Sequence, residues 1–296
     1  MTLREHIERL RRWLDKSWAD FRLGDLRLAD FGPAARKQLE RLGGIEPGGL
    51  MSDLAVALAF YTRLPVPLRA PVDGAALARA SWCSPLIGVV IGAIAGFAYW
   101  ISVRLNLPQL VAATVAVATS MMLTGCLHED GLADTADGFG GGATRERALD
   151  IMRDSRIGTF GACALIVSFA LRVGAIADLP KAGLVAWALI GAHAMARAGL
   201  PLFMRVVPPA RPDGLAAQAG APAAERAWAS LLIGFVILWI ALGFAAALIA
   251  LVFMLIGYAV VALMSHRKIG GQTGDVLGAV EQVGECIVLM TTAGRF

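Results

Sequence analysis

The sequence predicts an all-α, polytopic integral membrane protein: a helical bundle with about seven transmembrane helices and an amphipathic helix at its N-terminus. Of its 296 residues, 57% are hydrophobic and 17% are charged, and the mean hydropathy is +0.64. Soluble domains contain about 45–50% apolar and about 25% charged residues. The 33 glycines are typical of closely packed membrane helices. This composition excludes a disordered chain, a secreted disulfide scaffold and an ordinary cytosolic enzyme.

Residues 1–50 form a charged extension that differs from the membrane-embedded domain predicted for residues 51–296. The extension contains ten Lys/Arg and eight Asp/Glu. Its apolar residues recur at helical spacing, which predicts an amphipathic helix on a membrane surface or against a partner helix. A loosely ordered extension is the open alternative, and we assign this segment no chemistry.

The net charge of +4 and the four cysteines point to no further class. A modest basic excess in a membrane protein indicates cytoplasmic loops, so we expect no nucleic-acid partner. The cysteines form no CxxC pair, and most lie in apolar surroundings, which favours buried thiols over zinc ligands or disulfides.

Apolar runs separated by polar breaks give the predicted spans. A helix needs about 20 apolar residues to cross a hydrocarbon core of about 30 Å. The run 229–264 has 36 residues and is too long for one span, so we expect a break near Gly243. Leu50–Tyr61 is too short and is expected to be interfacial or re-entrant. The other predicted spans are 84–103, 108–126, 157–177, 184–203 and 275–293.

The distribution of basic residues supports seven spans. With the loop before residue 84 in the cytoplasm, the inner loops carry twelve Lys/Arg and the outer side carries three, Arg104, Lys181 and Arg295. Treating 229–264 as one helix would move Arg267 and Lys268 to the outer side. The excess of positive charge on cytoplasmic loops therefore favours two helices in this run.

Acidic residues concentrate in one segment of the membrane domain. Seven of the 15 carboxylates after residue 50 lie between residues 127 and 156. Asp130, Asp134 and Asp137 have i, i+4, i+7 spacing, so a helix places them on one face. Like charges on one face are unfavourable unless a cation neutralises them, and oxygen ligands suit Mg²⁺, which also binds substrate phosphates. The segment predicts a metal–diphosphate site at the cytoplasmic membrane surface; an acidic, solvated loop is the alternative.

Residues beside the aspartates suit a bound phosphate. Arg153 and Arg156, on a second predicted helix, are placed to bind a phosphate bidentately. His128 precedes the aspartates and is a candidate base or a residue that supports a metal ligand. Backbone N–H groups are expected to approach a ligand closely where glycines end the aspartate helix: Gly138, Gly140, Gly141 and Gly142.

Ionisable residues inside the predicted spans form a second candidate site. His193 and Arg197 are four residues apart on one helix face, and Glu281 and Glu285 are four apart on the last span. Charges at bilayer depth are costly and normally face the bundle interior or a wet cavity. We expect Arg172 to pair with one of these glutamates, and a purely structural salt bridge remains an alternative to a functional role.

Five segments, in order along the chain, resemble a known family: FYTRLPVP (60–67), SPLIGVVIG (84–92), HEDGLADTADGFGGG (128–142), IMRDSRIGTFG (151–161) and GGQTGDVLGA (270–279). They resemble the cobalamin synthase family, whose members are adenosylcobinamide-GDP ribazoletransferases. The resemblance runs from about residue 50 to the C-terminus. Glu129 departs from the family pattern, and its role stays open.

The resemblance implies the last assembly step of the cobalamin nucleotide loop, in which α-ribazole or its 5′-phosphate is joined to adenosylcobinamide-GDP and GMP leaves. It also implies an integral membrane protein that needs Mg²⁺. Asp130, Asp134 and Asp137 are expected to hold Mg²⁺ on the diphosphate, and one of them or His128 is expected to take the hydroxyl proton. Asp154 is expected to complete the metal shell or to orient an arginine. Phosphate contacts are expected from Arg153, Arg156 and the glycines, with partners from across the bundle at Gly271, Thr273 and Asp275.

Two other functions fit parts of the pattern. A CDP-alcohol-type membrane phosphotransferase also uses clustered aspartates, but Gly131 is followed here by Leu-Ala-Asp rather than Ala-Arg. An ion-coupled transporter would use the intramembrane polar residues, but no internal duplication supports it. We expect the protein in the bacterial cytoplasmic (inner) membrane with its active site on the cytoplasmic side. Small residues on several spans are compatible with a homo-oligomer.

Overall fold

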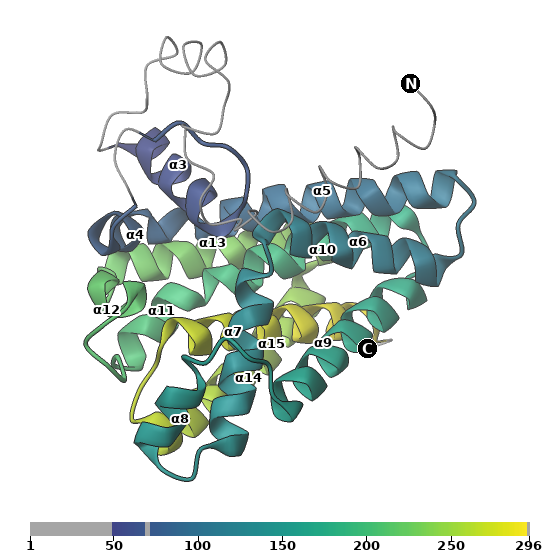
Figure 1. Cartoon of the computed structure of the whole chain (residues 1–296). Helices are drawn as coiled ribbons and strands as arrows, with labels where there is room; N and C mark the ends of the chain where they lie inside the picture. The colour runs from purple at the N-terminus through teal and green to yellow at the C-terminus, as the bar shows by residue number, and fades with distance from the viewer. Residues whose placement is uncertain (1–48, 69–71, 295–296) are drawn as a thin grey trace, which may run out of the picture.

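The computed structural model describes residues 49–68 and 72–294, and within these ranges the regular elements are helices (Figure 1). The amphipathic helix predicted for residues 1–50 lies outside the described residues except for its last two positions. A 3-10 turn at Ser81–Cys83 joins α4 to α5. The helices are α3 (Leu50–Tyr61), α4 (Gly74–Ala80), α5 (Ser84–Arg104), α6 (Gln109–Thr124), α7 (Leu127–Gly141), α8 (Arg145–Ile151), α9 (Thr159–Asp178), α10 (Ala182–Ala198), α11 (Leu200–Val206), α12 (Leu215–Ala219), α13 (Ala224–Leu242), α14 (Phe244–Ile269) and α15 (Gly274–Ala293).

The predicted bundle of about seven transmembrane helices is confirmed. In the described part of the chain, six helical segments are long and apolar enough to cross a membrane, and the bent pair α6–α7 gives a seventh if it counts as one span. The long apolar run divides at Gly243 into α13 and α14, as predicted. Gly243 has a φ of +86°, a left-handed conformation that glycine adopts without strain. At 12 residues, α3 is too short to span.

The acidic segment begins a new helix at a sharp bend. α6 and α7 meet at an angle of 90°. Gly125 and Cys126 both adopt left-handed backbone conformations, with φ of +63° and +57°, and so turn the chain between the two helices. Because α6 has 16 residues, it reaches only about 24 Å at about 1.5 Å per residue. The predicted span 108–126 therefore ends in this bend, and α7 leaves it in a new direction.

α10 and α15 lie in the middle of the bundle (Figure 1). α10 packs against α5, α13 and α15, and α15 packs against α7, α9 and α14. In their most apolar stretches, 72% of residues in Ala182–Val206 and 67% in α15 are buried, against 22% in α13 and in α14. Polar side chains on α10 and α15 therefore face protein, whereas α13 and α14 expose apolar side chains such as Leu232 and Ile256.

One local prediction is wrong. Arg153 and Arg156 were expected on a second helix, but α8 ends at Ile151 and both arginines lie in the loop before α9. The carboxylate of Asp154 accepts a hydrogen bond from the backbone N–H of Arg156 at 3.1 Å. This local turn competes with helix continuation, as aspartate side chains commonly do.

Candidate functional site

The aspartate cluster consists of Asp130, Asp134 and Asp137 on α7 together with Asp275 at the start of α15. The helix predicted for Asp130, Asp134 and Asp137 is present as α7, so their spacing places the three side chains along one face of it. Asp134 is half-buried and lies among the charges of Asp130, Asp275 and Asp137. No ion pair to a basic side chain within the described residues involves Asp130 or Asp134. Negative charge therefore accumulates here with little compensation.

Two glycines let α7 and α15 approach closely enough to join Asp275 to this cluster. A Cβ added at Gly131 would lie 2.7 Å from the carbonyl oxygen of Asp275, and one at Gly278 would lie 3.0 Å from the carbonyl oxygen of His128. Real Cβ atoms essentially never show the first distance, and the second is tighter than nine in ten real Cβ contacts. The glycines of the segments 128–142 and 270–279 thus act in helix packing, and this packing places a carboxylate from α15 beside those of α7.

Asp137 differs from Asp130 and Asp134 because its carboxylate already accepts two backbone hydrogen bonds. The side chain is 8% exposed and accepts the backbone N–H of Gly158 at 2.6 Å and of Gly161 at 2.8 Å. These bonds fix the first turn of α9 against α7. Each carboxylate oxygen retains a free lone pair, but the first role of Asp137 in the structure is to hold α9.

A cavity of about 330 Å³ opens beside the aspartate cluster. Its walls come from four segments that are far apart in sequence: α3–α4, α7, α11–α12 and the start of α15 (Figure 1). These four segments are the ones that the predicted topology places on the same side of the membrane. His128, Asp130 and Asp275 lie at the polar end, and most of the remaining wall is apolar. Burial raises the pKa of Tyr61, on the wall, to about 12 against the opposing charge of Arg197, so its phenol is neutral at neutral pH.

Arg211 and Gln272 also line the cavity, and the sequence analysis identified neither as a site residue. Arg211 Nη2 lies 3.8 Å from Asp275 Oδ2, and its Nη1 is buried without a hydrogen-bond partner among the described residues. The Gln272 side chain is 1% exposed, and in the same part of the chain neither its nitrogen nor its oxygen is hydrogen-bonded. The sequence did hold a signal for both residues: Arg211 lies in a predicted inner loop, and Gln272 lies inside the segment GGQTGDVLGA.

The segment before α15 is attached to the loop after α11. Gln272 donates its backbone N–H to the carbonyl of Pro208 at 2.8 Å, and Ala210 donates to the carbonyl of Gln272 at 2.8 Å. Gly271 permits this pairing because a Cβ there would collide with the carbonyl oxygen of Pro208. Thr273 caps α15 and donates to Asp275 Oδ2 at 3.1 Å. Gly271 and Thr273 thus position Asp275 and the cavity wall.

The other residues expected at the phosphates lie differently. Arg153 pairs with Asp213 at 2.7 Å, which connects it to the cavity rim, whereas Arg156 pairs with Asp154 at 2.6 Å in an exposed loop. Hydrogen bonds from Arg156 lower the pKa of Asp154 to about 2. Gly138, Gly140 and Gly141 lie within the last turns of α7, where helix hydrogen bonds occupy the N–H groups. At Gly138 and Gly140, an added Cβ would collide with Met152 and Phe160.

The second candidate site is a buried ion-pair network formed by Glu129, Arg172, His193, Arg197, Glu281 and Glu285. Arg172 Nη1 lies 3.0 Å from Glu129 and 3.3 Å from Glu285, so Arg172 pairs with one of the predicted glutamates and also with Glu129. Arg197 Nη1 lies 2.6 Å from Glu281. Every member is at most 5% exposed. The network gives Glu129, whose role the sequence left open, a structural partner.

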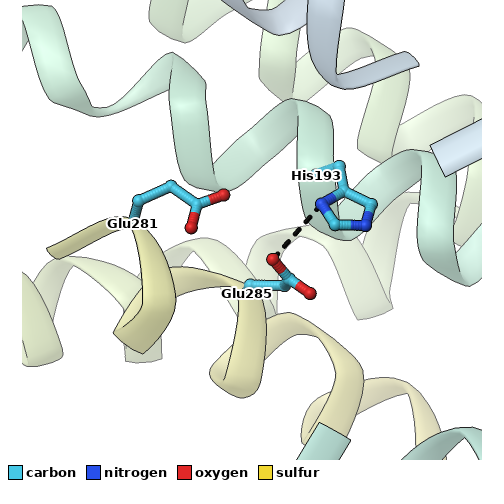
Figure 2. A group of neighbouring side chains, drawn as sticks. All are labelled: His193, Glu281 and Glu285. Carbon is cyan, nitrogen blue, oxygen red and sulfur yellow. Dashed lines mark ion pairs between the residues drawn. The ribbon is translucent and has the colours of Figure 1, made fainter. Parts of the chain in front are cut away.

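His193 and the two glutamates of α15 form the one group of three potential metal ligands in the described residues whose ligand atoms all lie within 4.8 Å of one another. Figure 2 shows His193 facing Glu285, with its Nδ1 3.2 Å from the carboxylate. Arg172 and Arg197 already pair with these glutamates, so positive charge is present in the network without a metal. The cluster is therefore best described as a set of buried ion pairs.

His128 joins the network to the cavity. Its Nδ1 lies 3.3 Å from Glu281 Oε2 and 3.3 Å from Arg197 Nη2, and its ring lies 5.9 Å from that of Tyr61. In the tautomer whose Nδ1–H donates to Glu281, the lone pair falls on Nε2, which is then free to accept a proton; in the other tautomer, Nδ1 accepts from Arg197 Nη2. Glu281 thereby orients the imidazole ring, which also lines the cavity.

The donors of the aspartate cluster suit a hard divalent cation. Mg²⁺ prefers oxygen ligands and is commonly held by one or two carboxylates together with water and substrate phosphates. Asp130 and Asp134 are one helical turn apart on α7, with no ion-pair partner in the described ranges, and Asp275 faces them from α15. A two-carboxylate site completed by substrate oxygens fits these residues, whereas a closed cage of three carboxylates does not.

Comparison with known proteins identifies close relatives over most of the chain. Residues 53–293 match the family model of cobalamin-5-phosphate synthase. A Bradyrhizobium diazoefficiens protein named adenosylcobinamide-GDP ribazoletransferase is 50% identical over 82% of this chain and 94% of its own length. Proteins of the same name from Azorhizobium caulinodans and Mesorhizobium japonicum are 47% and 42% identical, over 81% and 84% of this chain and 95% of their own lengths. No solved structure matches the chain.

Proposed function

The chain belongs to the cobalamin-5-phosphate synthase family, and on that premise we propose that it acts as an adenosylcobinamide-GDP ribazoletransferase whose reaction takes place between the aspartate cluster and the cavity. The overall reaction joins α-ribazole or its 5′-phosphate to adenosylcobinamide-GDP and releases GMP. The observation that carries the site assignment is the set of uncompensated carboxylates at the polar end of a cavity built from four distant segments.

The transfer requires an in-line displacement at phosphorus. A ribazole hydroxyl oxygen forms a bond to the phosphorus attached to cobinamide, and the bond from that phosphorus to the oxygen of GMP breaks. Such reactions depend mainly on positioning and on neutralising charge across the phosphates. We assign Asp130 and Asp134 to hold Mg²⁺, with the charge of Asp275 beside them. A bound Mg²⁺ would neutralise the negative charge of the diphosphate and of its leaving group.

The protein supplies the remaining groups. His128 takes the proton of the attacking hydroxyl at Nε2, while Glu281 holds its Nδ1–H. Arg211 and Arg153 are the basic side chains at the rim and wall of the cavity, and we assign Arg211 to a phosphate oxygen through its unpartnered Nη1. Arg156 and Asp154 satisfy one another in an exposed loop and receive no role in the reaction.

The positive-inside asymmetry supports a location in the bacterial inner membrane with the cavity on the cytoplasmic side. The four segments that line the cavity lie in or next to the loops that carry twelve basic residues, against three on the other side. Soluble nucleotide substrates would then reach the site from the cytoplasm.

The test is turnover by the purified full-length protein in liposomes. Adenosylcobinamide-GDP and α-ribazole are supplied with Mg²⁺, with or without a chelator, and corrinoid product and GMP are followed together. We expect equal amounts of both products, abolished by the chelator and restored by excess Mg²⁺. Turnover that survives complete chelation would refute the assignment of Mg²⁺. Absence of either product from folded protein would refute the transferase assignment, and CDP-alcohol transfer and ion transport would be assayed next.

A further inference from the structure

The apolar part of the cavity has no role in the chemistry of the aspartate cluster. Apart from the charged residues at its polar end, the wall is formed largely by small and apolar side chains, including Ala78, Leu77, Phe60, Pro201 and Met204. Ligand cavities typically measure about 300–1,000 Å³ and combine apolar walls with a few polar groups that orient the ligand. At about 330 Å³ this cavity accommodates a compact ligand and not a whole corrinoid nucleotide.

We propose that the cavity binds the substituted benzimidazole base of the ribazole acceptor, with the ribose directed toward His128 and Asp130. This inference rests on the proposed function. A dimethyl-substituted benzimidazole has two apolar methyl groups, an aromatic face and, once one ring nitrogen carries the ribose, a single remaining nitrogen acceptor. The wall supplies apolar surface, the rings of Phe60 and Tyr61, and few polar groups.

The alternative occupant, the guanine of the GDP moiety, fits the wall less well. Guanine carries several hydrogen-bond donors and acceptors on its edges, and burying any of them without a partner is unfavourable. Among the polar side chains of the wall, Arg211 and Thr273 lie next to Asp275 at the aspartate cluster. An apolar cavity that lies beside a cluster of charged groups suits a ligand with an apolar base and a polar sugar.

Gln272 supplies the polar contact that this base requires. Its side-chain amide is buried and lacks a hydrogen-bond partner within the described ranges, although Gln272 belongs to the cavity wall. Buried polar groups in native proteins are nearly always hydrogen-bonded, so a wall residue whose amide has no protein partner is available to a ligand once the amide turns toward the cavity. We assign its Nε2 as the donor to the free ring nitrogen of the base. Arg211 Nη1, the other unpartnered donor among the residues of the wall, is assigned to a phosphate oxygen, so Gln272 is the donor left for the base.

The test compares two phenylalanine substitutions on the same helix. Ala78 lines the cavity on α4, whereas Ala75 is exposed on that helix and is not part of the wall. We expect Ala78→Phe to raise the KM for ribazole at least about tenfold, in line with the discrimination that hydrophobic pockets achieve for one extra group. The KM for adenosylcobinamide-GDP should stay within twofold, and Ala75→Phe should change neither value.

Gln272→Leu provides an independent variant of similar shape. It should raise the KM for ribazole with little change in the KM for the corrinoid, and free dimethylbenzimidazole should inhibit the wild type competitively against ribazole but inhibit both cavity variants more weakly. A selective rise in the KM for adenosylcobinamide-GDP would place the corrinoid nucleotide in the cavity and overturn the proposal, as would unchanged constants in folded Ala78→Phe and Gln272→Leu. Wild-type turnover in the same assay tests the proposed function separately, because only the ratio of the two KM values tests the cavity.

Discussion

The aspartate cluster and the buried ion-pair network both contain carboxylates from α15 and its neighbours, but their carboxylates differ in whether a guanidinium lies beside them. In the network, Glu129, Glu281 and Glu285 each lie within 3.3 Å of a guanidinium nitrogen. In the cluster, Asp130 and Asp134 have no ion-pair partner among the described residues. Asp275 has one distant partner, Arg211, whose Nη2 lies 3.8 Å from its Oδ2. Each carboxylate of the network thus has a guanidinium beside it, whereas Asp130 and Asp134 of the cluster have none within the described residues. The difference identifies the cluster as the place where a cation and phosphates bind.

The comparison predicts first that neutralising an aspartate of the cluster removes activity but not the fold. Asp134→Asn should lower kcat/KM about a thousandfold, or roughly 4 kcal/mol, because charge on the phosphates is no longer neutralised. Thermal unfolding in detergent should be unchanged or slightly delayed, since repulsion with Asp130 and Asp275 falls. The exposed Asp150 on α8 is the matched control, and Asp150→Asn should leave both measurements unchanged. Wild-type turnover by Asp134→Asn would show that the Asp134 carboxylate has no role in the reaction.

The network should show the reverse pattern. Arg172→Met leaves Glu129 buried without an ion-pair partner and Glu285 with only His193 beside it, and breaking a buried ion pair typically costs about 3–5 kcal/mol of folding stability. Reversible unfolding in mixed micelles should show this loss, and the triple variant Glu129→Gln, Arg172→Met, Glu285→Gln should recover much of it. Arg267→Met, at an exposed position near the end of α14, should have no effect. A stable but inactive Arg172→Met protein would instead place the network in the reaction.

The close approach of α7 and α15 connects the two regions and should be sensitive to a single methyl group. Gly131→Ala places a Cβ 2.7 Å from the Asp275 carbonyl oxygen, and overpacking of this kind typically costs about 1–3 kcal/mol. Both stability and turnover should fall, because the helices separate and Asp275 moves with them. Gly174→Ala on α9 is the control, since nothing lies within 4 Å of its added Cβ. Equal effects of the two substitutions would show that the approach is not tight.

The smallest effect is expected at Asp154, which the sequence analysis offered as a metal ligand. Its partner Arg156 is exposed, and surface ion pairs contribute little, so Asp154→Asn should change kcat/KM by less than about threefold. Because the pKa of Asp154 is lowered to about 2, its carboxylate stays ionised at every pH above that value and contributes no titration to a pH–rate profile near neutrality. A fall in kcat/KM as large as that expected for Asp134→Asn would instead support Asp154 as a metal ligand.

The sequence predicted those parts of the molecule that depend on local spacing. The i, i+4, i+7 aspartates required only that a helix form, and the break at Gly243 required only that the apolar run be too long. Arg153 and Arg156 were misplaced because the Asp154 side chain competes for the backbone in a way that helical periodicity does not register. Arg211 and Gln272 could not be assigned because their loops reach the cavity through pairing between residues 208–210 and 272, which are more than sixty positions apart.

The distribution of partners in the network also constrains how the protein is made. Arg172 and Arg197 lie on α9 and α10, whereas Glu281 and Glu285 lie on α15, the last described helix. During co-translational insertion both arginines therefore emerge from the ribosome before these carboxylates exist, and Arg197 has no other ion-pair partner among the described residues. A charge at the centre of a membrane helix costs about 2.5–3.5 kcal/mol on the translocon scale. Insertion of α15 thus completes the ion pair of Arg197 and closes the bundle around the network.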